Sequence, residues 1–420
     1  MTKDDVFCVM PFVSLSLKPD GKVKPCCRFR SFDDDDNRDW STDEKINHNI
    51  LGTHNSLHSA AFESVRQDML EGKPIRGCSK CYDEERLRSE ENPLCSMRQG
   101  FNEQYNNCDT IGLQYLEVSF GNYCNLSCRT CHSGASSSWY EDELPLSKVY
   151  DMIVYDKIID IPFNWKVEDF KSITDIKFVG GEPMLNPNFS KFLQTVIDSG
   201  QASKVRLSIF TNCSWFPKPA VIEMLSKFDV VNIWLSIDAY GSKNDYIRNL
   251  SNWETVQNCA SKWLQYEKDG ILGVLLTPAV SILNTHILDE LIEWWISLRR
   301  KMDLSFKKRS VKKAVTEAGD IVFSSVVDPK HYDFRNAPNR KESIEKYRRC
   351  AEKHDDSVLQ RFYQKAISIL SQNVNKTSDL SEFIEVTKDL DKLRNQDFKS
   401  TFPELYAAIQ TDFDMVDGRL

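Results

Sequence analysis

From about residue 111 onward, strand-like and helix-like segments alternate along the chain, and this pattern constrains the fold more than any other feature. Short apolar runs predict strands at residues 113–120, 175–179, 205–210, 230–237 and 272–277, with a weaker sixth at 321–327. Amphipathic segments predict helices at residues 188–198, 219–227, 252–267 and 285–299. Strands separated by helices need crossover connections, so the pattern predicts a parallel sheet. About six such units indicate an α/β fold of the partial (β/α)6 TIM-type barrel kind, whose site forms at the C-terminal ends of the strands.

The regions on either side of this alternating pattern differ from it in composition. Residues 1–110 hold seven of the thirteen cysteines and predict a small cysteine-rich module of a β-hairpin and helices. Within it, residues 12–17 alternate like a strand, and residues 18–21 (Lys-Pro-Asp-Gly) form a turn signal. Residues 331–420 read as charged, amphipathic helices. We therefore expect an N-terminal module, a barrel over residues 111–330 and a helical C-terminal tail.

The composition limits the classes of function. The 420 residues are 41% hydrophobic and 28% charged, which allows a sizeable core and argues against global disorder. A net charge of −8 does not favour non-specific binding to nucleic acid. The longest apolar stretch, residues 271–283, is shorter than the roughly 20 residues that cross a membrane, and the N-terminus lacks the features of a signal peptide. We therefore expect a cytoplasmic protein without membrane contacts, whose cysteines serve metal or redox chemistry.

Three cysteines lie close together directly after the first expected barrel strand. Cys124, Cys128 and Cys131 have the spacing C-x3-C-x2-C, so their thiolates can converge on one soft metal centre. A [4Fe–4S] cluster usually takes four cysteines, and a set of three leaves one iron available for another ligand. A zinc site with His132 as the fourth ligand is the alternative, although this spacing is not usual for zinc fingers.

A second motif, Gly180-Gly181-Glu182-Pro183, ends the next expected strand. The two glycines allow a backbone to approach a ligand closely, and the Glu182 carboxylate is an acceptor for an ammonium group. The site of such a barrel forms where this strand and the preceding one end, so we expect this turn to act together with the cysteine loop.

The pairing of the three cysteines with Gly-Gly-Glu-Pro resembles the radical S-adenosylmethionine (SAM) superfamily over roughly residues 113–300. Later segments resemble the SAM-contacting motifs of the family in the expected order, which implies that SAM binds Thr211, Asn212, Ser236, Asp238, Arg248 and Asn284, together with Gly180, Gly181, Glu182 and Pro183. Two positions depart from the family pattern, because Thr130 stands where an aromatic residue is frequent and Cys213 stands where glycine is frequent. Neither departure concerns the ligation of the cluster.

The resemblance implies a definite chemistry. A [4Fe–4S] cluster binds the amino and carboxylate groups of SAM, reductive cleavage yields a 5′-deoxyadenosyl radical, and this radical takes a hydrogen atom from the substrate. By the habit of the family the substrate is a peptide or protein side chain, which is oxidised, crosslinked or epimerised. The electron comes from a low-potential donor such as a flavodoxin or a ferredoxin. A small molecule such as a sugar, nucleotide or cofactor precursor is the alternative substrate, and a zinc-binding, cysteine-rich scaffold without activity is the alternative to an enzyme.

The N-terminal cysteines resemble the twitch or SPASM-type modules that hold an auxiliary [4Fe–4S] cluster in radical SAM enzymes, although such modules more commonly follow the barrel. The resemblance implies a ligand set of Cys8, Cys78, Cys81 and one of Cys26 and Cys27. We prefer Cys26 because it follows a proline, as in the related modules.

A closed auxiliary cluster has a different role from the first cluster. It cannot activate SAM, but it can accept an electron from the product radical, which makes the reaction a net oxidation. A zinc site built from the same cysteines is the alternative, and Cys95 and Cys108 are further candidate ligands.

The remaining cysteines have two interpretations. Cys213, Cys259 and Cys350 are expected to be small buried hydrophobic residues, and Cys350 and Cys213 are also candidates for a hydrogen-atom donor to a substrate radical. The basic cluster within residues 307–313 is expected to be a solvated face or, alternatively, a grip on an anionic substrate. Residues 391–394 (Asp-Lys-Leu-Arg) resemble the tail of the family, and no role follows for them from the sequence.

Overall fold

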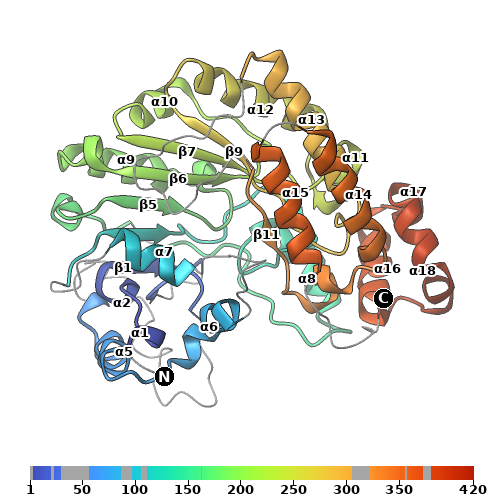
Figure 1. The fold of residues 1–420 in the computed structure, drawn as a ribbon, viewed down its shortest axis with the longest axis horizontal. Coiled ribbons are helices and arrows are strands. Elements are labelled where there is room, and N and C mark those ends of the chain that lie inside the picture. The colour runs from blue at the N-terminus through green and yellow to red at the C-terminus, as the bar shows by residue number, and fades with distance from the viewer. Residues whose placement is uncertain are drawn as a thin grey trace.

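The computed structural model describes residues 3–19, 23–29, 56–86, 97–105, 111–161, 163–304, 321–354, 357–371 and 380–420. These residues form an α/β fold around a seven-stranded sheet with the order β2-β1-β3-β5-β6-β7-β9 (Figure 1). Its strands are β1 (Ser14–Leu17), β2 (Val23–Lys24), β3 (Tyr115–Val118), β5 (Asp175–Phe178), β6 (Arg206–Thr211), β7 (Val230–Leu235) and β9 (Gly273–Leu276). All neighbouring strands are parallel except β1 and β2. The predicted fold class, a partial barrel with a small N-terminal module and a helical tail, is confirmed.

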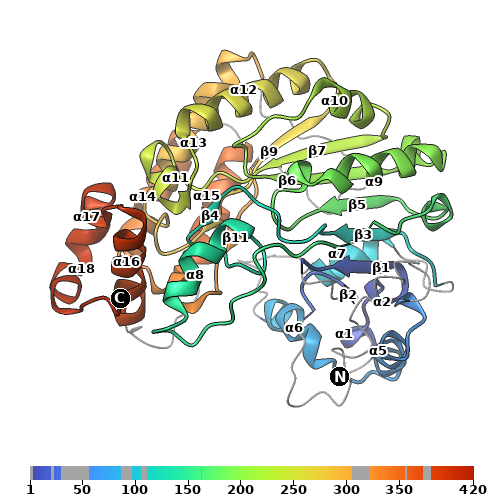
Figure 2. The same cartoon turned by 180° about the vertical axis from the view of Figure 1, so that it is seen from behind.

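Alternation of side chains gives the sheet one apolar, helix-covered face. Every second residue of β5, β6 and β7 is buried, including Phe178, Ile209 and Ile233. The helices over this face are α9 (Pro187–Asp198), α10 (Pro219–Leu225), α12 (Trp253–Lys268) and α13 (Leu288–Lys301), close to the predicted ranges (Figure 2). Asn186 and Asn252 begin α9 and α12 by accepting hydrogen bonds from backbone N–H groups of the first turn.

The N-terminal elements are continuous with the barrel sheet. Residues 12 and 13 were expected in a strand, but they belong to the short helix α2 (Met10–Val13), and β1 begins at Ser14. β1 pairs in parallel with β3, so the hairpin of β1 and β2 extends the sheet at its edge. The other described helices at this edge are α1 (Lys3–Val6), α5 (Ala60–Leu70), α6 (Ser79–Arg86) and α7 (Met97–Gln104) (Figure 1).

The expected sixth strand at residues 321–327 lies beside β9 with an interrupted ladder. β11 (Ser324–Ser325) pairs in parallel with β10 (Ala279–Val280), and Ile321 forms a parallel bridge to Leu276. Backbone N–H groups of this segment donate to the carbonyl oxygens of Leu276, Pro278 and Val280. Pro278 has no N–H to donate in return, so regular strand pairing breaks there.

The described C-terminal helices are α14 (Arg340–Lys353), α15 (Ser357–Leu370), α16 (Ser381–Arg394), α17 (Phe398–Thr401) and α18 (Pro403–Met415). The buried apolar residues of α14 and α15 belong to the main core, whereas α16, α17 and α18 pack on the barrel through a second apolar core. In this core Tyr246 and Ile282 of the barrel meet Phe383, Phe398 and Phe402 of the tail. Both ribbon views show α16 beside α8 (Tyr140–Leu146), which it contacts (Figures 1 and 2). In the described part of the chain, each helix is too short or too polar to cross a membrane.

His286 lies in this second core, against the ring of Phe402, and gives the tail interface a pH dependence. Burial, and then the Lys243 and Lys346 ammonium groups, lowers the pKa of His286 to about 4 from its ordinary 6.5. Below pH 6.5 the unfolded chain gains a proton that the folded chain does not, so the free energy of unfolding falls as the pH falls towards 4. We expect a loss of up to about 3 kcal/mol.

The measurement is urea unfolding of the wild type and His286→Leu at several pH values between 7.5 and 4.5. The variant is expected to lose less stability than the wild type over this interval. Identical pH dependence in the two proteins would contradict a neutral, buried His286.

Candidate functional site

The three predicted cluster cysteines lie in the loop that connects β3 to α8. Within this loop Ser127–Cys128 form the short strand β4, which pairs antiparallel with β8 (Arg248–Asn249). The indole Nε1 of Trp139 donates a hydrogen bond to the carbonyl oxygen of Cys128 at 2.7 Å. These contacts hold the loop through its backbone.

The thiols of this loop are close enough to influence one another's ionisation. Burial, and then the Cys128 thiol, raises the pKa of Cys124 to about 12, and burial followed by the other two thiols raises the pKa of Cys131. Two donors lie near the sulfur atoms, with Asn212 Nδ2 3.9 Å from Cys124 Sγ and Arg248 Nη1 3.8 Å from Cys128 Sγ. Hydrogen bonds to cysteine sulfur tune the potential of an iron–sulfur cluster, so the surroundings suit that type of centre.

The thiol side chains of this loop are not turned towards one common metal position among the described residues. Within the described ranges, no group of three or more His, Cys, Asp or Glu residues is arranged to hold a metal ion. Cys131 Sγ lies 3.7 Å from the carbonyl oxygen of His132, whose ring accepts a hydrogen bond from Gly134 N at 3.2 Å. Rotation about Cα–Cβ redirects a thiol without moving the backbone. Three half-buried thiols on one anchored loop therefore fit a cluster in their donor chemistry.

The two glycines after β5 pack against the cysteine loop. Gly180 and Gly181 have φ values of 77° and 57°, and a Cβ on Gly181 would lie 2.2 Å from the carbonyl oxygen of Tyr123. The backbone N–H groups of Gly181 and Glu182 donate to the carbonyl oxygens of Ala135 and Tyr123 at 3.0 and 2.8 Å. We expected these glycines to admit a ligand, but in the structure the partner that approaches Gly181 is the backbone of the cysteine loop.

The Glu182 carboxylate is buried behind this turn, with the residue 1% exposed. Its Oε2 accepts a hydrogen bond from Asn212 N at 2.7 Å, and its Oε1 is buried with no hydrogen-bond partner in the described part of the chain. Burial raises the pKa of Glu182 to about 7. A buried acceptor without a donor is unfavourable, so Oε1 marks a place where a ligand donor is expected. Pro183 is buried and begins the short 3-10 turn that follows.

Residues from the later strand ends form one hydrogen-bonded network. Arg248 Nε lies 2.8 Å from Asp238 Oδ2, and Asn284 Nδ2 donates to the Asp238 carbonyl oxygen at 2.8 Å. Ser236 N donates to the carbonyl oxygen of Thr211 at 2.8 Å, which ties the ends of β7 and β6 together. Because Arg248 also approaches Cys128, this network reaches the cysteine loop.

All of these positions except Asn284 fall within a match to a known family. Residues 118–282 match the family model of the Radical SAM superfamily. Residues 118–282 thus form a domain that matches this enzyme superfamily, over less than half of the 420 residues. The match includes the three cysteines, Gly180–Pro183 and the residues of β5 to β10, but not the N-terminal cysteines.

Solved structures similar to this chain include radical SAM proteins at low identity. Native anSMEcpe with bound AdoMet and Cp18Cys peptide has 14% identity and a TM-score of 0.39, covering 57% of this chain and 60% of that chain. Streptococcus suis SuiB bound to precursor peptide SuiA has 13% identity and a TM-score of 0.35, covering 85% of this chain and 70% of that chain. The alignment thus spans 60% of the length of the first of these structures. A comparison with curated proteins gave no match.

Four cysteines of the N-terminal region also influence one another. Burial, and then the neighbouring thiols of Cys27, Cys8 and Cys78, raises the pKa of Cys26. Burial, followed by Cys8 and Cys81, raises the pKa of Cys78. The structure therefore brings Cys8, Cys26, Cys78 and Cys81 into one neighbourhood.

Helices α6 and α7 hold the backbone around Cys8. Arg98 donates to the Phe7 carbonyl oxygen and forms an ion pair with Glu85, while Asn102 Nδ2 donates to the same oxygen at 3.0 Å. Tyr82 OH donates to the Val6 carbonyl oxygen at 3.2 Å. Cys95 and Cys108, the further candidate ligands, lie outside the described residues.

Cys27 faces a different environment from Cys26. Burial, and then Glu117, raises the pKa of Cys27, while Lys177 and Lys18 oppose the increase. Glu117 lies on β3, with its carboxylate 2.9 Å from Lys177 Nζ and 3.6 Å from Lys18 Nζ, and it accepts a hydrogen bond from Ser16 at 2.8 Å. Burial alone would raise the pKa of Glu117, but the two ammonium groups outweigh it and lower the pKa to about 2.

This network around Glu117 was not predicted from the sequence. The sequence feature that could have indicated the network is Glu117, a charged residue within an apolar strand, because a buried charge needs an ionic partner. The same face of the sheet carries an aromatic pair, Phe210 and Trp234, whose rings stack with centroids 5.1 Å apart. Lys177 Nζ lies 5.0 Å from the centroid of the Phe210 ring. The indole nitrogen of Trp234 is buried with no hydrogen-bond partner among the described residues.

The remaining predicted cysteines lie in helix-packing regions. Cys213 is buried with φ 59°, and its thiol lies 3.6 Å from the Val256 carbonyl oxygen of α12. Cys259 lies on α12 and is also buried. Cys350 lies on α14, where burial and then Asp289 raise its pKa. These surroundings fit packed thiols, and a hydrogen-donor role for Cys213 or Cys350 stays a prediction. The basic cluster within 307–313 lies outside the described residues.

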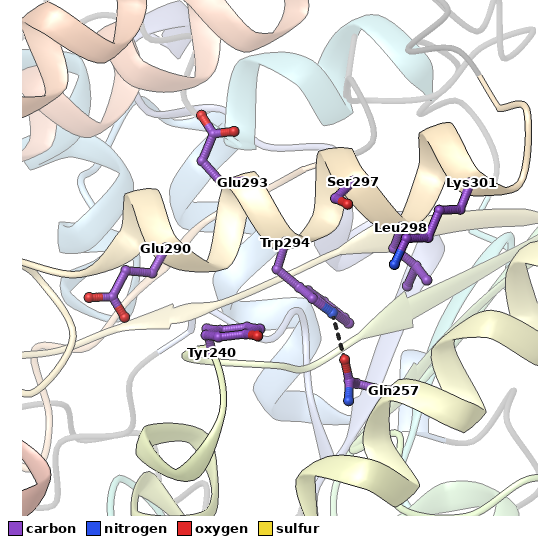
Figure 3. A pocket seen from close by; sticks show the side chains of 8 residues that line it. All are labelled: Tyr240, Gln257, Glu290, Glu293, Trp294, Ser297, Leu298 and Lys301. Carbon is purple, nitrogen blue, oxygen red and sulfur yellow. Dashed lines mark hydrogen bonds between the residues drawn. The ribbon is translucent and has the colours of Figure 1, made fainter.

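A surface pocket of about 500 Å³ lies between α12, α13 and the loop after β7 (Figure 3). Trp294 Nε1 donates to Gln257 Oε1 at 3.1 Å across it, and Glu290 at its rim pairs with Lys243 at 2.8 Å. These polar groups already have protein partners, and the pocket is lined by residues other than the predicted site residues. It is therefore separate from the candidate site.

The packing of Gly181 against Tyr123 gives a stability prediction. Gly181→Ala is expected to lower the free energy of unfolding by more than about 2 kcal/mol, because a positive φ disfavours alanine and the added Cβ meets a backbone oxygen. Gly200→Ala is the matched control, because Gly200 has φ 73° and no atom of the described residues lies within 4 Å of the place that a Cβ would take there. It is expected to lose about 1 kcal/mol.

Urea unfolding of the metal-free proteins measures both losses. Equal losses in the two variants would contradict a specific requirement for glycine beside the cysteine loop.

Proposed function

We propose that this chain is a two-cluster radical SAM enzyme that reductively cleaves SAM and abstracts a hydrogen atom from a peptide or protein side chain. The observation that carries the proposal is the arrangement at the carboxyl edge of the sheet. There an anchored loop with three thiols meets a buried carboxylate, Glu182, and an ion pair, Arg248–Asp238. A low-potential donor such as a flavodoxin or a ferredoxin is the proposed source of electrons.

Cys124, Cys128 and Cys131 are the proposed ligands of the first [4Fe–4S] cluster. When bound, this cluster supplies the electron that cleaves the sulfonium C–S bond of SAM. Glu182 Oε1, which is buried and has no partner within the described ranges, is the proposed acceptor for the ammonium group of SAM. Burial raises the pKa of Cys128, and the positive charge of Arg248 nearby opposes this increase.

Cys8, Cys26, Cys78 and Cys81 are the proposed ligands of an auxiliary [4Fe–4S] cluster. The support for Cys26 over Cys27 is that Cys8 and Cys78, after the adjacent Cys27, influence the pKa of Cys26, whereas the strongest neighbouring influence on the pKa of Cys27 is Glu117. A closed cluster at this place would accept the electron that a substrate radical releases when it loses a proton, and the reaction would be a net two-electron oxidation.

The substrate is proposed to bind on the polar face of the sheet, between the two sets of thiols. Phe210 and Trp234 offer an aromatic surface for a side chain, and Lys177 and Lys18 place two positive charges beside the single negative charge of Glu117. This excess of positive charge favours a second candidate, a small anionic molecule such as a nucleotide or a sugar phosphate. Deuterium transfer from labelled peptides or labelled small molecules into 5′-deoxyadenosine distinguishes the two.

The two ligand sets predict separable iron contents. After anaerobic reconstitution the wild type is expected to hold about eight irons per chain, and Cys124→Ala/Cys128→Ala/Cys131→Ala about four, because each cube-type cluster has four. Cys26→Ala is expected to hold about four irons, and Cys27→Ala, the matched neighbour, about eight. The measurements are iron and acid-labile sulfide, followed by 5′-deoxyadenosine formed with dithionite and SAM.

Each outcome has a definite meaning. About four irons in the wild type and none in the triple variant would remove the auxiliary cluster from the proposal. Loss of iron in Cys27→Ala instead of Cys26→Ala would exchange the two assignments. Zinc without sulfide, and no cleavage of SAM, would contradict the enzyme proposal altogether.

The role of Glu182 has its own test. Glu182→Gln keeps an acceptor for Asn212 N but removes the negative charge, so we expect SAM to bind about tenfold or more weakly. Equilibrium binding of SAM to the reconstituted protein measures the change, with Glu117→Gln as the control because Glu117 is a buried glutamate with other partners. Equal weakening in both variants would remove Glu182 from the SAM site.

A further inference from the structure

The cysteine loop contains a buried arginine whose partners come from the C-terminal helices. Arg129 lies between Cys128 and Cys131, and the residue is 1% exposed. Its guanidinium group forms an ion pair with Asp391 of α16 and donates to Gln396 Oε1 at 2.8 Å. Asp391 lies 262 residues and Gln396 267 residues after Arg129 in the sequence.

The carboxylate of Asp391 connects three parts of the molecule. Besides Arg129, it accepts hydrogen bonds from Tyr246 OH at 2.7 Å and from Phe398 N at 2.6 Å. The Tyr246 ring lies 3.8 Å from the Arg129 guanidinium carbon, which places the cation over an aromatic face. The cysteine loop, α11 (Ser242–Ile247) and the start of α17 thus meet at this one carboxylate.

Two further contacts reach the same loop from the tail. Asn395 ends α16 in the left-handed conformation, and Gln396 then donates to Asn249 Oδ1 at 3.1 Å in β8, the strand paired with β4. Arg394 donates to Asp142 at 2.8 Å, and its guanidinium carbon lies 4.6 Å from the Trp139 ring centroid. Trp139 in turn holds the Cys128 carbonyl oxygen.

We propose that residues 391–396 form a clamp that positions the cluster-binding loop, with Asp391 and Gln396 acting through Arg129. This inference rests on the proposed function for its catalytic meaning, but the clamp itself is a property of the metal-free chain. Asp391 and Gln396 are positioning residues, because their contacts are with Arg129 and β8 rather than with the thiols.

The chain offers a matched control on the same helix. Asp389 is a buried carboxylate two residues before Asp391, and it accepts hydrogen bonds from Tyr150 OH at 2.7 Å and from the backbone N–H groups of Arg419 and Leu420 at 3.0 Å. Asp389→Asn therefore makes the same chemical change as Asp391→Asn, at a position whose partners are not in the cysteine loop.

The first measurement is hydrogen exchange of the backbone between residues 122 and 136 in the metal-free, full-length protein. Asp391→Asn is expected to speed exchange there by about tenfold or more, because it removes the charge that pairs with a buried guanidinium. Asp389→Asn is expected to leave this segment unchanged and to speed exchange near residue 150. If Asp391→Asn does not fold, Gln396→Ala replaces it, with a smaller increase expected in the same segment.

The second measurement is the rate at which a chelator removes iron from the reconstituted proteins, together with the electron paramagnetic resonance spectrum of the reduced cluster. Asp391→Asn is expected to lose iron faster and to give an altered spectrum, while Asp389→Asn matches the wild type. Equal exchange in all variants, or equal effects of Asp389→Asn and Asp391→Asn, would overturn the clamp. A wild type that binds no iron would contradict the proposed function, while the exchange result would still decide the clamp.

Discussion

The approach of two loops at the carboxyl edge of the sheet determines the geometry of the candidate site. Gly181 and Glu182 donate backbone hydrogen bonds to Ala135 and Tyr123, which lie on either side of the three cysteines. The contact brings the loop after β5 against the loop after β3, and it leaves no room for a side chain at position 181. The buried carboxylate of Glu182 and the thiols take their relative positions from it.

The sequence predicted the barrel well, because each strand buries one face and each connecting segment has a helical apolar face. The ranges 205–210 and 252–267 correspond closely to β6 and α12. The resemblance to radical SAM proteins, carried by the three cysteines and Gly-Gly-Glu-Pro, agrees with the family match over residues 118–282. Local patterns were sufficient for these predictions, since periodicity and motif spacing are local properties.

The rest depended on partners far apart in the sequence. Nothing in residues 12–17 indicates that β1 adds to β3, because pairing is decided by register and not by composition. The Arg129–Asp391 pair joins positions separated by 262 residues. Glycines 180 and 181 were expected to let a ligand approach closely, whereas the neighbour of Gly181 in the structure is protein backbone from the cysteine loop.

The parallel pairing of β1 with β3 makes the N-terminal region a poor candidate for transplantation. Ser16 of β1 donates to Glu117 of β3, so the inner face of the barrel is completed by a side chain from the cysteine-rich module. A chimera in which a module without β1 replaced residues 1–110 would leave the edge of β3 exposed. It would also deprive the buried Glu117 carboxylate of the hydrogen bond from Ser16. Evolutionary exchange of this region would therefore have to preserve the edge strand, even where the cysteines themselves were lost.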